Sequence, residues 1–195
     1  MEKRSAIPET QKVMKTLDCR GCVVTADAMN TPKATAQAII EDAHGDYCLA
    51  LKGNQKTACQ EVKEYFSCEE LLREVQEKEG CYKKETEETS IETITREYYI
   101  TDDIKWFADR KEWKKLTSIG YERKTVAKKG TEETRIEERY YLCSIKPIAE
   151  LICHVYNKTV EILLPQKHET NPKYDRKKTG KGDTSNPCCS ESIIR

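Results

Sequence analysis

The feature that most constrains the fold is an alternation of short apolar runs with amphipathic stretches over residues 22–66. The run CVVTA at residues 22–26 is rich in β-branched side chains, which is typical of a strand buried on both faces of a parallel sheet. The run DYCLALK at residues 46–52 has the same character, and helix-like stretches follow the two runs at residues 33–43 and 56–66. The order strand, helix, strand, helix predicts an α/β fold with a right-handed crossover and a mostly parallel core sheet.

A single acid, Asp27, stands at the carboxyl end of the first predicted strand. An ionised carboxylate beside a core must be hydrated, paired or bound to a metal. Open α/β sheets bind ligands at the carboxyl ends of their strands, so this position is a candidate for metal binding. A turn-forming or helix-capping role explains the same acid at least as well.

The chain before the first strand predicts a short helix within residues 1–18. Pro8 suits a helix start, and Ile7, Val13, Met14 and Leu17 can share one face. Cys19 and Cys22 then form the pair CRGC, which has the spacing of a redox or zinc half-site. No second pair has ligand spacing, so we interpret both as small apolar residues of the core.

The character of the chain changes after residue 67. The stretch at residues 67–90 is densely charged, and Leu71, Leu72 and Val75 in it predict a helix that is solvated on its other side. Three later runs are rich in Thr, Tyr and Ile with polar residues interleaved, which predicts antiparallel strands with one face toward water. These runs lie at residues 90–103, 116–130 and 131–145, and KKG at residues 128–130 is a predicted hairpin turn.

Residues 104–116, between the first two of these runs, predict a short helix that packs Trp106 and Trp113 onto the sheet. A further helix is predicted at residues 148–164. The remainder, at residues 165–195, mixes Pro, Gly, Ser and basic residues without a period and is predicted to be disordered.

Composition excludes some partners. The 34 Lys and Arg residues balance 34 Asp and Glu residues, so the net charge gives no overall attraction to nucleic acid or to an anionic membrane. No apolar stretch approaches the roughly 18 residues that span a bilayer, and the first residues lack a signal-peptide pattern. We therefore expect a cytoplasmic protein whose ten cysteines are reduced.

Five segments carry a resemblance to a known family. They are VVTADAMNTPK, DYCLALKGNQ, YYITDDIKW, WKKLTSIG and EERYYLCSI, in this order and at these spacings. Together they resemble the H-repeat-associated transposases of bacterial insertion sequences, which belong to the DDE transposase superfamily with an RNase H-like fold. The resemblance extends over roughly residues 1–155.

The resemblance implies a site. Asp27 matches the second acid of the catalytic triad and would be a catalytic residue and metal ligand. In this family two Asp and one Glu hold two Mg²⁺ ions that activate water, and later a 3′-hydroxyl, for attack on DNA. Lys52 and Asn54 follow the neighbouring strand and would meet a phosphate or base of the DNA, with an exposed turn as the rival interpretation. The expected partners are the DNA ends of an insertion sequence and its target, and a homodimer is left open.

The resemblance also implies three regions. Residues 1–67 would be a partial RNase H-like core of parallel strands with flanking helices, residues 68–146 a charged helix and antiparallel β insertion, and residues 147–195 a divergent helix and disordered tail. The family's first acid stands in an Asp-Gly-Lys motif that this sequence lacks. Its final Glu follows a His-Trp, whereas Glu161 here has different neighbours.

These departures predict a truncated, catalytically incomplete transposase. One alternative is a non-catalytic DNA-binding remnant that uses the β insertion and the basic tail. The other is a decayed reading frame without a function, which predicts an unfolded product.

Overall fold

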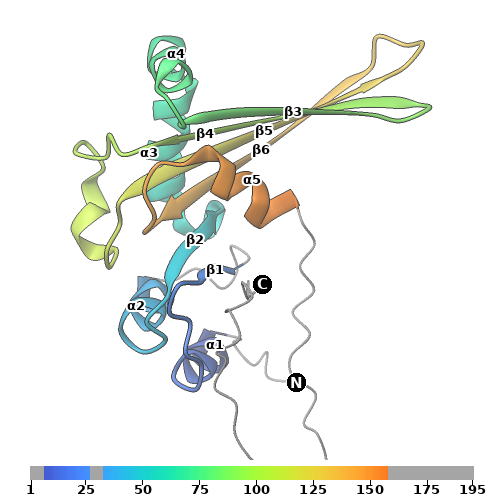
Figure 1. Ribbon diagram of the computed structural model, residues 1–195. Coiled ribbons are helices and arrows are strands. Elements are labelled where there is room, and N and C mark those ends of the chain that lie inside the picture. The colour runs from blue at the N-terminus through green and yellow to red at the C-terminus, as the bar shows by residue number, and fades with distance from the viewer. Residues whose placement is uncertain (1–6, 27–32, 158–195) are drawn as a thin grey trace, which may run out of the picture.

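The computed structural model describes residues 7–26 and 33–157, and everything below refers to these residues. They form a single six-stranded sheet in the order β1-β2-β6-β5-β4-β3, flanked by helices, so the fold is mixed α/β (Figure 1). The strands are β1 (Val23–Ala26), β2 (Asp46–Leu51), β3 (Tyr82–Glu88), β4 (Glu92–Thr101), β5 (Ser118–Lys128) and β6 (Thr134–Cys143). The α-helices are α1 (Ile7–Met14), α2 (Lys33–Glu41), α3 (Lys56–Ser67), α4 (Glu69–Glu77) and α5 (Ala149–Asn157), and the 3₁₀ turns are η2 (Gly53–Gln55) and η3 (Ala108–Glu112).

The sheet is mixed rather than mostly parallel. β1 and β2 are parallel, with Val23 opposite Asp46 and Ala26 opposite Leu49. All other neighbouring strands of the described chain are antiparallel. The parallel pairing predicted for the strands of residues 1–67 and the antiparallel pairing predicted for the later runs are confirmed. The sheet as a whole is not mostly parallel, because β6, the last strand of a meander, pairs with the free edge of β2. The same sheet thus runs through the predicted core at residues 1–67 and the predicted β insertion.

Each face of the sheet has its own core. On one face the strands pack against α1 to α4 and the β4–β5 loop, with Tyr47, Leu49 and Tyr121 among the buried residues. On the other face α5 covers Cys48, Ile100, Tyr141 and Cys143. Figure 1 shows α5 in front of the strands and α3 behind them. The β-rich half of the sheet is therefore buried on both sides near the body of the protein.

Two long hairpins, β3–β4 and β5–β6, project from the body as an arm (Figure 1). We use this name for residues 83–97 and 122–139. Where the arm joins the body, each of its four strands carries a tyrosine, and each tyrosine lies opposite the one on the neighbouring strand. These residues are Tyr82, Tyr99, Tyr121 and Tyr140. Beyond them most side chains are half-buried or exposed, because no helix covers the outer part of either hairpin.

Two predicted elements differ from the structure. The charged stretch at residues 67–90 contains α4 as predicted, but also β3, whose sequence YKKETEE carries almost no apolar signal and pairs along its length with β4. The predicted helix at residues 104–116 is reduced to the 3₁₀ turn η3. Trp113 is buried, as predicted, whereas Trp106 is 38% exposed and stacks on Tyr65 of α3 rather than on the sheet.

Within residues 7–26 and 33–157, each helix is too short or too polar to span a bilayer.

Candidate functional site

The carboxyl ends of β1 and β2 lie at the same edge of the sheet, because the two strands are parallel and in register. β1 ends at Ala26, and Asp27 is the next residue of the chain. Asp27 itself lies outside the described residues, as does Glu161. The structure does describe β1, the strand that precedes this acid. Its two central residues are buried, because Val24 is 1% exposed and Thr25 is 3% exposed. The prediction of a strand buried on both faces just before Asp27 is confirmed.

Lys52 and Asn54 follow β2 at the same edge. Lys52 is exposed and has an extended backbone, with φ −142° and ψ −176°, immediately before the turn η2. Asn54 lies within that turn. An open depression of about 570 Å³ adjoins the turn, and its lining comes from the turn and the first half of α3: Gly53, Lys56, Thr57, Cys59, Gln60 and Glu61. The exposed Lys52 therefore follows β2 at the edge where β1 ends.

Metal ligands do not cluster in the part of the chain that is described. Residues 7–26 and 33–157 contain no group of three or more His, Cys, Asp or Glu side chains placed to hold an ion. Cys19 belongs to the core, and Cys22 packs against it, so the CRGC pair acts as the small apolar filler expected of it.

The β4–β5 loop, residues 102–117, lies along α2. It joins β4 and β5 at the edge of the sheet where β2 begins, because Ser118 is opposite Cys143 and Cys143 is opposite Cys48. The Lys33 ammonium, on the first residue of α2, lies 2.7 Å from the Asp109 carboxylate and also pairs with Glu112. At the other end of α2, Glu41 accepts from Lys114 at 2.6 Å. These contacts hold the loop along the length of α2.

The ion pairs shift the pKa values of Lys33 and Glu41. Partial burial lowers the pKa of Lys33, but its hydrogen bonds to Asp109 and Glu112 outweigh this and raise the pKa above its usual value. The hydrogen bond from Lys114 holds the pKa of the Glu41 carboxyl below its usual value. Both contacts therefore favour the charged state of the groups that hold the loop to α2.

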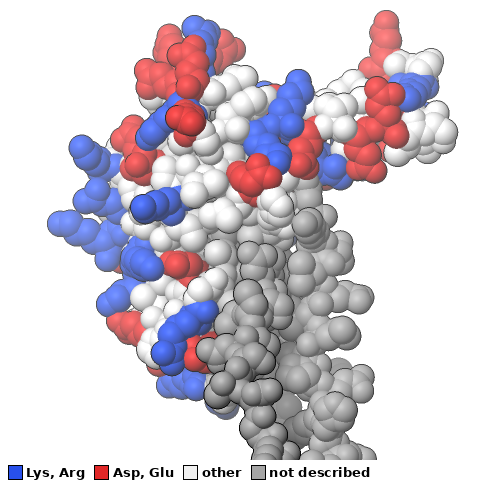
Figure 2. Space-filling view, viewed as in Figure 1, with Lys and Arg blue, Asp and Glu red and all other residues white. Residues whose placement is uncertain are grey.

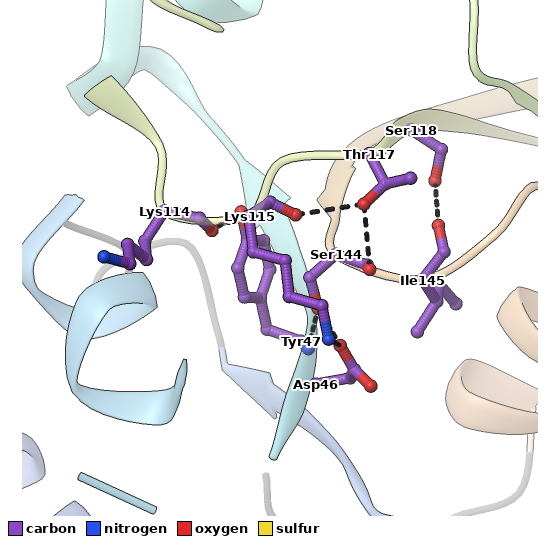
Figure 3. Close-up of polar contacts among 8 residues, drawn as sticks. All are labelled: Asp46, Tyr47, Lys114, Lys115, Thr117, Ser118, Ser144 and Ile145. Carbon is purple, nitrogen blue, oxygen red and sulfur yellow. Dashed lines mark hydrogen bonds and ion pairs between the residues drawn. The ribbon is translucent and has the colours of Figure 1, made fainter. Parts of the chain in front are cut away.

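The end of the loop is fixed to the beginning of β2 by a partly buried polar network (Figure 3). The Lys115 ammonium lies 2.8 Å from Asp46 Oδ1, and Ser144 Oγ donates to the same oxygen at 2.7 Å. Ser144 Oγ in turn accepts from the Tyr47 N–H at 2.8 Å. Thr117 Oγ1 lies 3.0 Å from the carbonyl of Ser144. These contacts join three segments that are far apart in the sequence, and so make the loop a fixed part of the fold.

The loop was not recognised from the sequence as a functional element. Its apolar residues Ile104, Phe107 and Trp113 are 5%, 2% and 1% exposed and anchor it to the body. The sequence analysis predicted instead a short helix at residues 104–116 that packs Trp106 and Trp113 onto the sheet. The informative signal was the concentration of basic residues between the anchors, in DRKEWKK at residues 109–115.

The arm is electrically balanced, in contrast. It contains nine basic and ten acidic residues. Ion pairs join many of them, for example Arg96 with Glu87 at 3.3 Å and Lys129 with Glu88 at 3.1 Å. This pairing leaves little net positive potential on the β insertion to attract the phosphates of DNA.

Two curated proteins are similar to the chain. An uncharacterized protein in the dhlA 3′ region of Xanthobacter autotrophicus is 31% identical over 115 residues, which are 59% of this chain and 36% of that protein. The putative protein YbfL of Escherichia coli strain K12 is 28% identical over 165 residues, which are 79% of this chain and 41% of that protein. The chain thus spans less than half the length of either relative. No protein-family model matches it, and no solved structure matches it significantly.

Proposed function

We propose that the chain is part of a DDE-type transposase and that β1, α2, β2 and α3 form part of its RNase H-like core. The observation that carries this proposal is the parallel pair of β1 and β2, with a buried strand that leads directly to Asp27 at the carboxyl edge. Such an edge is where α/β sheets bind ligands. The resemblance of the five sequence segments supplies the chemistry.

The order of elements supports the same assignment. After β2 and α3 the chain forms the β-rich hairpins, and only then α5, which packs on the opposite face of the sheet. The resemblance implies this sequence of a last core strand, a β insertion and a helix that leads to the final acid. In this proposal Glu161, which follows α5 in the chain, is the residue to test for that role.

The proposed mechanism uses few groups of this chain. Asp27 would supply carboxylate oxygens to Mg²⁺, which prefers octahedral oxygen coordination. When bound, a pair of such ions activates water or a 3′-hydroxyl for in-line attack on a phosphodiester. Lys52, and Asn54 in the following turn, contact the phosphate or base of the DNA beside this edge. Because two ions need several carboxylates, we expect no cleavage by the chain by itself.

Paramagnetic broadening by Mn²⁺ tests the metal site. We expect millimolar Mn²⁺ to broaden the amide signals of Val23–Ala26 and of Lys52 in an NMR spectrum of the labelled protein. Asp27→Ala should remove this broadening. The matched control is Asp42→Ala, which deletes an exposed acid beyond the other end of α2 and should leave the broadening unchanged. Broadening that is centred elsewhere, or that survives Asp27→Ala, contradicts the proposal.

A nicking assay tests the expected inactivity. Supercoiled plasmid incubated with the purified chain and Mg²⁺ should remain uncut. Nicking that Asp27→Ala abolishes would overturn the expectation that the site is incomplete, while it would support Asp27 as a catalytic residue.

A further inference from the structure

The acidic residues of the β4–β5 loop each interact with another group of the protein. Lys33 pairs with both Asp109 and Glu112, and the Lys78 ammonium lies 2.7 Å from the Asp102 carboxylate. Asp103 interacts with the Tyr65 hydroxyl of α3 and lines a depression there together with Glu61 and Glu64. Each acid of the loop therefore has a partner within the protein, although Asp102, Asp103 and Glu112 are exposed.

The basic residues of the loop have the opposite arrangement. Lys105 and Lys111 are exposed and Arg110 is half-buried, and within residues 7–26 and 33–157 these three form no ion pair. Lys114 and Lys115 adjoin them, each held by one acid and each still about half exposed. Figure 2 shows Lys and Arg side chains gathered along the edge of the molecule where Figure 1 places this loop.

The backbone of the loop that carries these charges is fixed to the body of the protein without a ligand. Phe107 and Trp113 are buried on either side of η3, and the Arg110 N–H donates to the carbonyl of Phe107 at 3.2 Å. The Glu61 carboxylate accepts from the Ala108 N–H at 3.2 Å and so fixes the start of the turn to α3. A fixed array of cations loses less conformational entropy on binding than the same residues would on a mobile tail.

We propose that Lys105, Arg110 and Lys111 form a contact surface for the phosphate backbone of double-stranded DNA. The inference rests on the proposed function for its choice of polyanion and adds the residues that hold the DNA. The loop presents these cations on the exposed surface along α2, to which the Lys33 ion pairs hold η3.

Salt-dependent binding tests the proposal. Each phosphate contact by a cation contributes about 0.9 to the slope of log K against log salt for double-stranded DNA. We expect the triple variant Lys105→Gln, Arg110→Gln, Lys111→Gln to reduce this slope by about 2.7, measured by fluorescence anisotropy with a 30-bp duplex between about 50 and 200 mM NaCl.

The matched control removes the same number of charges from the arm. It combines Lys84→Gln, Lys128→Gln and Lys129→Gln, and we expect it to leave the slope nearly unchanged. Equal losses in the two variants would show that net charge alone governs binding and would overturn the proposal. So would the absence of any effect in the loop variant once circular dichroism shows that it is folded.

Two further measurements separate this inference from the proposed function. Asp27→Ala should bind the duplex as tightly as the unaltered chain. If Mn²⁺ broadening depends on Asp27 but the loop variant binds DNA normally, the surface is wrong and the metal site stands. If the loop variant loses DNA binding while Asp27→Ala leaves the broadening unchanged, the DNA surface stands and the metal site is wrong. Binding to phosphatidylserine vesicles without binding to DNA would overturn the inference in favour of a membrane surface.

Discussion

The Tyr47 hydroxyl donates a hydrogen bond to the main-chain carbonyl of Lys114 at 2.8 Å. Tyr47 lies at the beginning of β2 and is fully buried, whereas Lys114 belongs to the β4–β5 loop. Burial raises the pKa of Tyr47 far above its ordinary value, so the hydroxyl stays protonated and remains the donor. This contact fixes the end of the loop over the parallel strand pair, and the placement of the proposed DNA surface depends on it.

Tyr47→Phe should therefore lower the free energy of unfolding by about 1–3 kcal/mol, because the Lys114 carbonyl loses its partner in a site closed to water. Urea denaturation followed by fluorescence measures the change. Lys114→Ala is the control, since it keeps the carbonyl and removes only an exposed ion pair, which should cost at most about 0.5 kcal/mol. Similar losses in both variants would mean that the side chain of Lys114, and not its carbonyl, holds the loop.

Gly120→Ala should be destabilising because β5 and α5 approach closely at this glycine. A Cβ atom there would lie 2.5 Å from Ile152 Cδ1 and 3.4 Å from the Cβ of Tyr141. Overpacking of this kind costs about 1–3 kcal/mol. Ile152→Val deletes the colliding methyl group, so the double variant should be more stable than the sum of the two single losses. A double-mutant cycle by thermal denaturation measures the coupling, and strictly additive losses would argue against this contact.

The pair of Lys78 and Asp102 should make stability depend on pH. The hydrogen bond from Lys78 lowers the pKa of Asp102 below 3.8, its ordinary value. The pair therefore stabilises the folded state above pH 3.8, and this contribution disappears as the pH falls through the lower pKa of the folded protein. Lys78→Met should lose under about 1 kcal/mol at pH 6, since both side chains are half exposed, and the loss should shrink toward pH 3. Lys105→Met, which breaks no ion pair, should show a difference that does not vary over this range.

The cysteines should differ in their reaction with an alkylating agent. Cys48 and Cys143 are fully buried in opposite positions of β2 and β6, with their sulfur atoms 3.2 Å apart. Burial raises the pKa of the Cys143 thiol, which further slows its reaction. Cys22 and Cys68 are half exposed. Peptide mass spectrometry after iodoacetamide treatment should find the second pair modified first and the buried pair modified only in urea. Early modification of Cys143 would show that β2 and β6 separate readily.

Local signals predicted several elements of the fold well. The apolar run before Asp27, the stretches that became α2 and α3, and the turn at Gly130, which has a φ of +78°, each carry their information within a few residues. Leu71, Leu72 and Val75 likewise marked α4 correctly. These elements were predictable because side-chain period and turn chemistry act over short separations.

The remaining features depend on partners that lie far along the chain. β3 is a strand because β4 pairs with it, and its charged sequence does not reveal this. Val13 was expected on the buried face of the first helix but is 45% exposed, because that helix buries Met14 against α2 and the strands. The role of Lys33 depends on acids more than 70 positions later, which the sequence does not connect to it.

The antiparallel pairing of β2 with β6 affects how the protein folds during its synthesis on the ribosome. Cys48 and Cys143 face each other across this pairing, although 95 positions separate them in the chain. At about 5–20 residues per second, translation needs roughly 5–20 s to supply the second strand after the first has emerged. Throughout that interval the apolar strand β2 has an unpaired backbone edge on the side that later pairs with β6. Chaperones would bind the nascent chain at this exposed edge.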